Sequence, residues 1–184
     1  MASEQPAGLA AEAGPFPPDA PLATYRALFR SLPAAAPGAL VGRCDALAIG
    51  PRWYRALFTA ILWAGGLRGW SGKEFAPGGA GVNLCRRGDR LVTRCRLQLE
   101  GPVASHVDGR PALLLRYLDR SPLRLVRDEL RSMPDGTVLG LTYLVLPLLS
   151  RVRLPFAIRR AEPPGVQARP ARAAAVSPAP RPSA

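Results

Sequence analysis

The segment 69–75 (GWSGKEF) holds the only lysine of the chain beside a tryptophan. If the segment is extended, Trp70, Lys73 and Phe75 are expected to alternate so that all three point into the interior of a barrel. A lysine buried in apolar surroundings loses proton affinity, and it can then form a Schiff base or pair with a ligand carboxylate. The alternative is a lysine at the rim, with its alkyl chain packed beside the tryptophan and its ammonium group in water.

A second set of candidates consists of charged residues on segments that are expected to be neighbouring strands. Arg116 and Arg127 interrupt otherwise apolar series, which favours an arginine that faces inward. Buried together, such charges could hold a carboxylate or move a proton, because burial and like charge raise carboxylate pKa values. Exposed, they would form a cross-strand ladder that contributes little stability. The predicted ligand-binding residues are Trp70, Lys73, Phe75, Arg43, Arg116, Asp119 and Asp128.

Other kinds of site find little support in the sequence. His106 is the only histidine and adjoins a turn, where we expect it to be exposed to solvent. Cys44, Cys85 and Cys95 lack the spacing of zinc ligands, so we expect reduced core residues, no metal and no other cofactor. The chain has no phosphate-binding glycine loop and no Gly-x-Ser-x-Gly elbow, so the sequence names no reaction.

Two helices are expected to precede most of the strands. Between residues 21 and 32 apolar positions recur at steps of three and four, and Pro33 ends this first helix. In residues 52–65 large apolar side chains cover more than half of the helix circumference. A helix of this kind is buried on several sides or lies as a lid across an apolar opening.

The second half of the chain predicts an antiparallel meander. Between residues 91 and 100 apolar and polar side chains alternate, which is typical of a strand with one buried face. The residues expected to lie inside are Leu91, Thr93, Cys95, Leu97 and Leu99. Further strands are expected within 39–49 and at 73–75, 82–85, 112–118, 123–130, 137–146 and 153–159. Pro155 removes one backbone donor and predicts an edge or a bulge in the last strand.

Seven or eight short strands after one or two helices must form a sandwich or close on themselves. We expect a mainly β fold, an antiparallel β-barrel, because closure removes the exposed edges. A barrel of about eight strands has room for side chains or for one small ligand. The fold class therefore allows a binding cavity.

The composition is basic, with a formal net charge of +12, and all but one of the 25 basic residues are arginine. Arginine usage in a GC-rich genome explains this at least as well as polyanion binding does, and the aromatic residues that single-strand binders interleave with basic ones are missing. The first 20 residues lack the basic start and apolar run of a signal peptide. The most apolar segment, 56–67, is too short to span a membrane as a helix. We therefore expect a cytoplasmic protein without a transmembrane segment or a specific nucleic-acid partner.

Several segments together resemble the paired GXWXG and DUF4334 domains over about residues 21–160. They are residues 40–43 (LVGR), 69–75 (GWSGKEF), 117–119 (YLD) with Pro122, 127–131 (RDELR) and 135–140 (DGTVLG). The pattern departs where Cys44 and Ala46 stand in place of the name-giving Trp and the second Gly. The resemblance implies a calycin-like barrel, of the lipocalin or fatty-acid-binding type, and no settled activity.

The expected organisation is a disordered lead over residues 1–20, one barrel domain over 21–161 and a disordered Pro/Ala/Arg tail over 162–184. Within the barrel, residues 21–88 resemble the GXWXG part and residues 89–161 the DUF4334 part. The predicted function is intracellular binding of a small hydrophobic or acidic-amphipathic molecule, such as a fatty acyl, polyketide or isoprenoid compound. Two alternatives stay open. One is an isomerase or cyclase that uses the same cavity, with Lys73, Arg43, Asp119 or Asp128 assisting, and the other is a polyanion-binding module.

Overall fold

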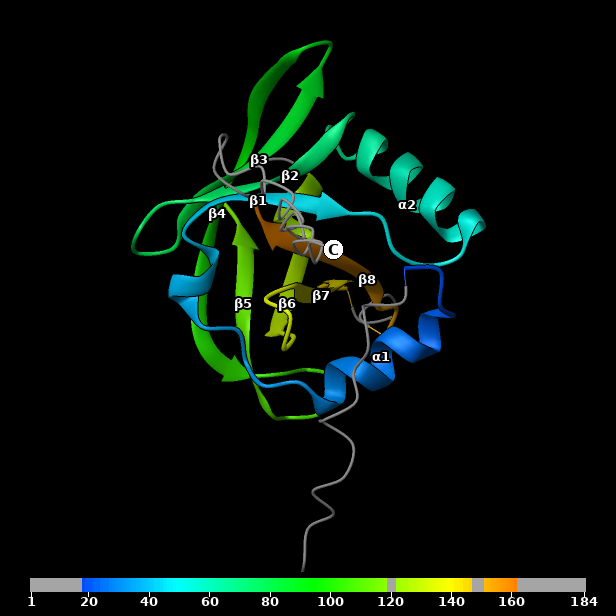
Figure 1. Ribbon diagram of the computed structural model, residues 1–184, viewed down its shortest axis with the longest axis vertical. Helices are drawn as coiled ribbons and strands as arrows, with labels where there is room; N and C mark the ends of the chain where they lie inside the picture. Colours follow the sequence, from blue (N-terminus) through cyan, green and yellow to red (C-terminus); the bar gives the residue numbers. More distant parts are fainter. Residues whose placement is uncertain (1–17, 119–121, 147–150, 162–184) are drawn as a thin grey trace, which may run out of the picture.

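Eight antiparallel strands form a closed barrel, in which each strand is hydrogen-bonded to the next along the chain and β8 returns to β1 (Figure 1). The computed structural model describes residues 18–118, 122–146 and 151–161, so most of the expected lead and all of the expected tail lie outside the described residues. The predicted mainly β barrel is confirmed. The strands are β1 (Gly42–Leu47), β2 (Trp70–Phe75), β3 (Ala80–Arg87), β4 (Arg90–Ala104), β5 (Pro111–Tyr117), β6 (Val126–Ser132), β7 (Val138–Leu144) and β8 (Leu154–Arg160).

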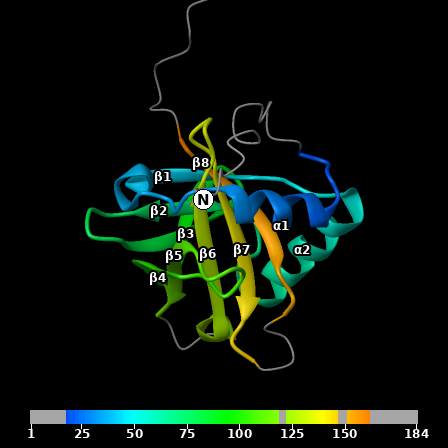
Figure 2. The same ribbon diagram turned by 90° about the horizontal axis from the view of Figure 1, so that it is seen from below.

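Both helices lie on one side of the barrel, as the two views in Figures 1 and 2 show. α1 (Leu22–Ser31) and α2 (Arg52–Ala64) agree closely with the predicted segments. The stretch expected to be a strand from residue 123 begins instead as the short 3-10 helix η2 (Pro122–Leu125), and a second one, η1 (Pro37–Leu40), precedes β1. α2 joins the end of β1 to the start of β2, so it lies at the barrel end where η2 joins β5 to β6.

The barrel wall separates two hydrophobic cores, one inside the barrel and one outside it under α1. Tyr25 and Phe29 are the buried residues of α1, and they pack on the outer faces of β7 and β8. The Tyr25 hydroxyl accepts hydrogen bonds from the backbone N–H groups of Ala20 and Gly50, both at 3.1 Å, which fix the helix to the chain before α2. The inner core consists chiefly of Leu40, Cys44, Phe75, Leu97, Leu99, Leu113, Leu115, Leu130, Val138, Phe156 and Ile158.

The predicted alternation of β4 is only partly correct. Leu97 and Leu99 are buried in the inner core and Cys95 packs against it, but Leu91 and Thr93 are exposed. The register with β3 shifts here, from Val82 opposite Arg96 to Asn83 opposite Arg94, which leaves Cys95 as an extra residue with φ of 46°. A β-bulge of this kind exchanges the inner and outer faces of the strand, so the regular pattern fails before Cys95.

The predicted edge or bulge at Pro155 is correct only locally, because β8 is paired on both sides but not along its whole length. β8 pairs with β7 on one side and with β1 on the other. Pro155 lies opposite Leu141 of β7, whereas pairing with β1 ends at Ala157. The ladder to β1 therefore ends before the residue that lacks an N–H, and the Pro155 carbonyl is free to accept a 2.6 Å hydrogen bond from Tyr54 of α2.

The cysteines lie where the sequence predicts reduced core residues. None of the three is in a disulfide; Cys44 and Cys85 are buried, and Cys95 is half-buried. Burial raises the pKa of the Cys44 thiol to about 11, so this group stays protonated at neutral pH. Within the described residues we find no helix long and apolar enough to cross a membrane.

Candidate functional site

Inside the barrel, two cross-strand pairs of polar residues are joined by a tyrosine. Lys73 of β2 lies opposite Asn83 of β3, and Asp128 of β6 lies opposite Thr142 of β7. The Lys73 ammonium group donates to Asn83 Oδ1 at 3.0 Å and to the Tyr117 hydroxyl at 2.9 Å. Tyr117 in turn donates to Asp128 Oδ2 at 3.0 Å. The five side chains form one network, which we call the inner network.

The inner network contains an ion pair that is almost fully removed from water. Lys73 Nζ lies 3.5 Å from Asp128 Oδ2, and each side chain is only 2% exposed. The second oxygen of the carboxylate accepts a 2.7 Å hydrogen bond from Thr142. Taking two charges out of water costs several kcal/mol per ion before their attraction is counted. The pair is therefore a feature that the fold holds at a cost.

Burial changes the proton affinities of the network. It lowers the pKa of Lys73, while the nearby Asp128 charge opposes this shift. Burial also raises the pKa of Tyr117 well above its usual value, and the Asp128 charge adds to that rise. Tyr117 is thus a hydrogen-bond donor to the carboxylate rather than a ready source of phenolate, and Lys73 loses its proton more easily than an exposed lysine does.

Aromatic rings enclose the lysine. Its Nζ lies 5.5 Å from the ring centre of Trp70, 5.1 Å from that of Tyr117 and 5.6 Å from that of Phe156. Rings at this distance attract a cation through their negative faces. Trp70 also donates from Nε1 to Asn83 Oδ1 at 3.1 Å. The single lysine is therefore held in place by rings and hydrogen bonds together.

A β-bulge brings Trp70 and Lys73 to the same side. Residues three apart in a regular strand face opposite sides, so the expectation of simple alternation is wrong for these two. The register of β2 with β3 shifts between Trp70 and Gly72, which turns both side chains inward. Gly72 is needed at the bulge, because a Cβ there would lie 2.0 Å from the Cys44 carbonyl oxygen.

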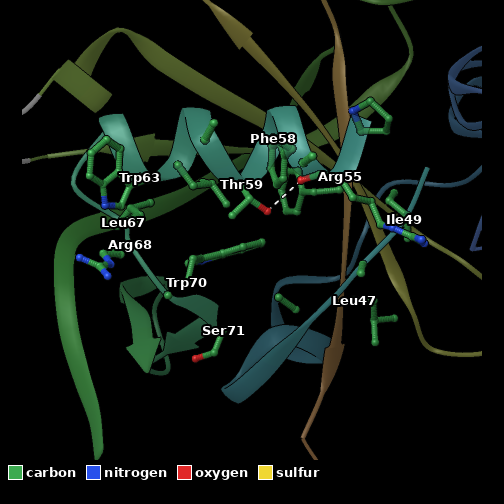
Figure 3. A pocket seen from close by; sticks show the side chains of 18 residues that line it. Leu47, Ile49, Arg55, Phe58, Thr59, Trp63, Leu67, Arg68, Trp70 and Ser71 are labelled. Carbon is green, nitrogen blue, oxygen red and sulfur yellow. Dashed lines mark hydrogen bonds between the residues drawn. The ribbon is translucent and has the colours of Figure 1, made fainter. Parts of the chain in front are cut away.

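Two hollows meet at Trp70 under α2. The larger, of about 630 Å³, is a groove between α2 and the chain around β1 and β2. Figure 3 shows Phe58 of α2 beside Trp70 in this groove, with Arg55 and Arg68 near its opposite ends. The smaller hollow, of about 60 Å³, lies inside the barrel and reaches Lys73, Tyr117, Asp128 and Thr142. The residues that line both hollows are Phe58, Leu62, Leu67, Trp70 and Phe156.

The wall between the hollows is made mainly of aromatic rings in edge contact. The ring centres of Phe58 and Trp70 are 6.2 Å apart, and those of Trp70 and Phe156 are 6.1 Å apart. No hydrogen bond joins these rings to one another. The Trp70 ring is hydrogen-bonded to Asn83 instead. Phe58 and Trp70 are therefore part of the wall that separates the outer groove from the polar inner cavity.

The predicted site residues separate into groups. Trp70, Lys73 and Asp128 come together in the inner network, whereas Phe75 is buried in the inner core and lines neither hollow. Arg43 and Arg116 lie outside the barrel, in exposed ion pairs with Asp45 and Glu100. The prediction of an inward-facing arginine at 116 is wrong, because Arg116 alternates with Leu115 and Tyr117, which occupy the inner face. Asp119 lies outside the described residues.

Sequence reasoning missed Asn83, Thr142 and Tyr117 as site residues. A signal existed for the first two, since each is a polar residue inside an otherwise apolar strand segment, in GVNLC and in GLTYL. His106 is exposed, as predicted. Among the described residues, no group of three or more His, Cys, Asp or Glu side chains is placed to hold a metal ion.

Comparison with known proteins supports the fold. The crystal structure of a protein from Thermomonospora curvata aligns with a TM-score of 0.57 and 18% sequence identity, over 78% of this chain and 90% of that chain. At such low identity the likeness concerns the fold alone. No family model and no curated protein matches the chain. Membership of the GXWXG and DUF4334 family therefore stays a prediction.

Proposed function

We propose that the barrel binds one small, mainly apolar molecule under α2, with a polar group of that molecule directed at the inner network. The observation that carries the proposal is a buried lysine–tyrosine–aspartate set at the inner end of an otherwise apolar hollow. Ligand sites typically combine an apolar lining with a few convergent polar groups of this kind. The apolar body of the ligand would contact the apolar lining, and its polar end would contact the inner network.

The sizes of the hollows indicate how a ligand would lie. The inner cavity of about 60 Å³ holds a small group only, whereas the groove of about 630 Å³ lies in the range of roughly 300–1,000 Å³ found for ligand pockets. We infer that the body of the ligand lies in the groove. Its polar end would enter between Phe58 and Trp70 after their rings move apart.

The charges of the inner network favour a neutral polar group on the ligand. Asp128 already balances the charge of Lys73, so a ligand carboxylate would add a second negative charge to a dry cavity. A ketone or hydroxyl oxygen needs only a donor, which Lys73, Tyr117 or Thr142 can supply by exchanging a partner. A carbonyl or alcohol ligand therefore fits better than a fatty acid, which favours the hydrophobic over the acidic-amphipathic class among the two that the sequence predicts.

A matched ligand series tests this proposal. Trp53→Phe/Trp63→Phe leaves Trp70 as the only tryptophan, so its fluorescence reports binding of undecan-2-one, undecanol and undecanoic acid. We expect the ketone or the alcohol to bind more tightly than the acid, and Tyr117→Phe to weaken binding by about 0.5–1.5 kcal/mol. Arg116→Ala, outside the barrel, is the matched control and should leave affinity unchanged. Absence of binding by all three compounds would contradict the proposal, and a tighter acid whose affinity falls in Lys73→Ala would reverse the choice of polar group.

A second proposal is proton transfer at the same site, as in an isomerase or a cyclase acting on a polyketide-like or isoprenoid-like ketone. The observation that favours it is the contact of Lys73 with Tyr117 and Asp128, in which one group has a lowered pKa and the others can pass a proton on. Isomerisation of a β,γ-unsaturated ketone needs one proton removed and one returned, with no redox partner.

Deuterium incorporation tests the catalytic proposal separately from binding. A β,γ-unsaturated C11 ketone in D₂O should gain deuterium and shift its double bond into conjugation, as followed by NMR and ultraviolet absorbance. Asp128→Asn and Lys73→Met should abolish the exchange, while Arg116→Ala retains it. If the wild type incorporates deuterium no faster than Lys73→Met does, catalysis on this substrate is excluded. The binding proposal would not be affected.

A further inference from the structure

The outward face of α2 is apolar although it lies in water. Trp53, Leu57 and Ile61 follow one another at four-residue steps and are 61%, 48% and 43% exposed. Trp53 and Leu57 line neither hollow, so the groove does not explain them. Trp63, on the neighbouring side of the helix, is 60% exposed. A surface helix ordinarily turns a polar face to water, so this one is built for a partner.

The apolar surface continues around the same end of the barrel. In an antiparallel barrel of consecutive strands, α2, the β3–β4 turn, η2 and the described residues between β7 and β8 (145, 146 and 151–153) all lie at one end. Within the described part of the chain, every exposed large hydrophobic residue belongs to this end, and the opposite end has none. The set comprises Trp53, Leu57, Ile61, Trp63, Leu91, Leu118, Leu125, Val145, Leu146 and Val152.

The same end is strongly basic. Its described acidic residues are Asp19, which pairs with Arg55, and Asp89 of the β3–β4 turn. α2 itself has two arginines and no acidic residue. The exposed arginines of this end are Arg52, Arg68, Arg86, Arg87, Arg90, Arg124 and Arg151. This end therefore combines exposed apolar side chains with an excess of positive charge. Its partner should have an apolar interior and a negatively charged surface layer.

We propose that this end of the barrel docks on an anionic lipid membrane, with the outward face of α2 inserted at the headgroup boundary. Tryptophan is suited to that boundary, because its ring is apolar and its N–H can reach water or a headgroup. Each arginine near an anionic membrane surface adds electrostatic attraction, and the buried apolar side chains add to the binding. Docking here would place the groove under α2 against the membrane and goes beyond ligand binding itself.

Vesicle flotation with matched variants tests the proposal. Vesicles of phosphatidylcholine with one third phosphatidylglycerol should bind the protein, and pure phosphatidylcholine should bind it at least about tenfold more weakly. Trp53→Ser/Leu57→Ser should lower the partition coefficient by about tenfold or more, because it removes the inserted side chains. Arg52→Gln/Arg68→Gln should lower it about tenfold. The control Arg43→Gln/Arg159→Gln removes the same charge from the opposite end and should change it less than about twofold.

Several results would overturn the membrane assignment. One is absence of flotation with the anionic vesicles, and another is equal binding to both lipid compositions. If Trp53→Ser/Leu57→Ser instead converts a dimer into a monomer in sedimentation equilibrium without changing flotation, the apolar face serves a second copy of the chain. If single-stranded oligonucleotide binds with an affinity that depends on Arg52 and Arg68 but not on Trp53 and Leu57, and competes with the vesicles, the end is a polyanion site.

Discussion

Strand β6 carries two buried ionic clusters, one on each face, and they are satisfied to different degrees. On the outer face, Arg131 is fully buried and donates two hydrogen bonds to Asp108, at 2.7 and 2.8 Å. It also donates to the carbonyl oxygens of Phe29, Arg110 and Pro111. On the inner face, the Lys73–Asp128 pair is separated by 3.5 Å and borders a cavity.

The contacts of the outer cluster indicate that it stabilises the fold. Arg131 holds α1 through Phe29, and it holds the β4–β5 turn through Asp108, so one side chain joins three parts of the chain. Its neighbour Glu129 accepts a 2.8 Å hydrogen bond from the His106 N–H and another from Ser105, whose Oγ donates. All the donors of the guanidinium group are used, as is expected where a buried charge stabilises a fold.

The inner cluster is less complete. Asn83 Oδ1 accepts from both Trp70 and Lys73, so its assignment as the oxygen follows from the two donors. The other amide atom, Nδ2, is buried and has no hydrogen-bond partner among the described residues. An unmade buried hydrogen bond costs about 1–3 kcal/mol. A polar set that is kept at such a cost beside a cavity is more consistent with a ligand site than with a stabilising one.

The largest effect is expected from the outer cluster. Arg131→Met should lower the free energy of unfolding by about 3–5 kcal/mol, because Asp108 and several carbonyl groups lose their buried partner. Urea denaturation at neutral pH measures the change. A loss below about 1 kcal/mol would mean that the guanidinium contacts do not hold α1 and the turn, and the contrast between the clusters would disappear.

A smaller loss of stability is expected from the inner cluster, with a characteristic pH dependence. Lys73→Met should cost about 1–3 kcal/mol at neutral pH, since Asp128 keeps its two other donors. The pKa of Lys73 in the folded protein lies below the 10.5 of the unfolded chain, so unfolding takes up a proton and stability rises with pH in that interval. The stability of the wild type relative to Lys73→Met should therefore increase as the pH rises toward 10.5.

Tyr117 sets the upper limit of the pH range in which stability rises. The pKa of Tyr117 is raised in the folded protein, so above about pH 10 only the unfolded chain ionises there and stability begins to fall. Urea unfolding of both proteins between pH 7 and 9.5 measures the difference. A constant difference across this range would contradict a Lys73 pKa that folding lowers into this range.

The smallest effect is expected at the exposed ion pair on the barrel exterior. Arg116 and Glu100 are 3.0 Å apart, and their side chains are 47% and 37% exposed. Water screens such a pair, so Arg116→Ala should change the free energy of unfolding by less than about 1 kcal/mol. Thermal unfolding of this variant gives the stability loss for an exposed pair, against which the losses at the two buried clusters are compared. A larger loss would indicate a packing role for the arginine side chain.

Much of the fold could be predicted from the sequence, because most strands and both helices carry their own periodicity. The regular inner residues of β4, Leu97 and Leu99, follow from alternation alone. Leu91 and Thr93 do not, since one extra residue at Cys95 exchanges the faces and nothing in the residue types announces it. The bulge in β2 is similar, although Gly72 offers a local reason for irregular backbone.

The site was predictable only in part, for a related reason. Lys73 is the only lysine and stands near Trp70 and Phe75, which marks it from the sequence alone, whereas Asp128 lies in the charged run 127–129 and is not distinguished there from its two neighbours. Arg116 interrupts an apolar series, yet it lies outside, because its face is decided by the register of β5 with β4 and β6. The same register turns Tyr117, the next residue of β5, into the barrel and makes it a site residue. Which neighbours of a strand face inward is a property of the closed sheet, and it cannot be derived from one strand.

The attachment of α2 has a consequence for how quickly the cavity opens. Among the residues of α2, all of which the structure describes, Tyr54 is the only one that is buried. The helix can therefore detach by local unfolding, at a free energy well below that of the whole barrel, whose strands are paired on both sides. Exchange of a bound molecule would then follow the opening rate of this one helix. A substitution that weakens the barrel as a whole would shorten the lifetime of the folded protein without shortening the residence time of a molecule bound as we propose.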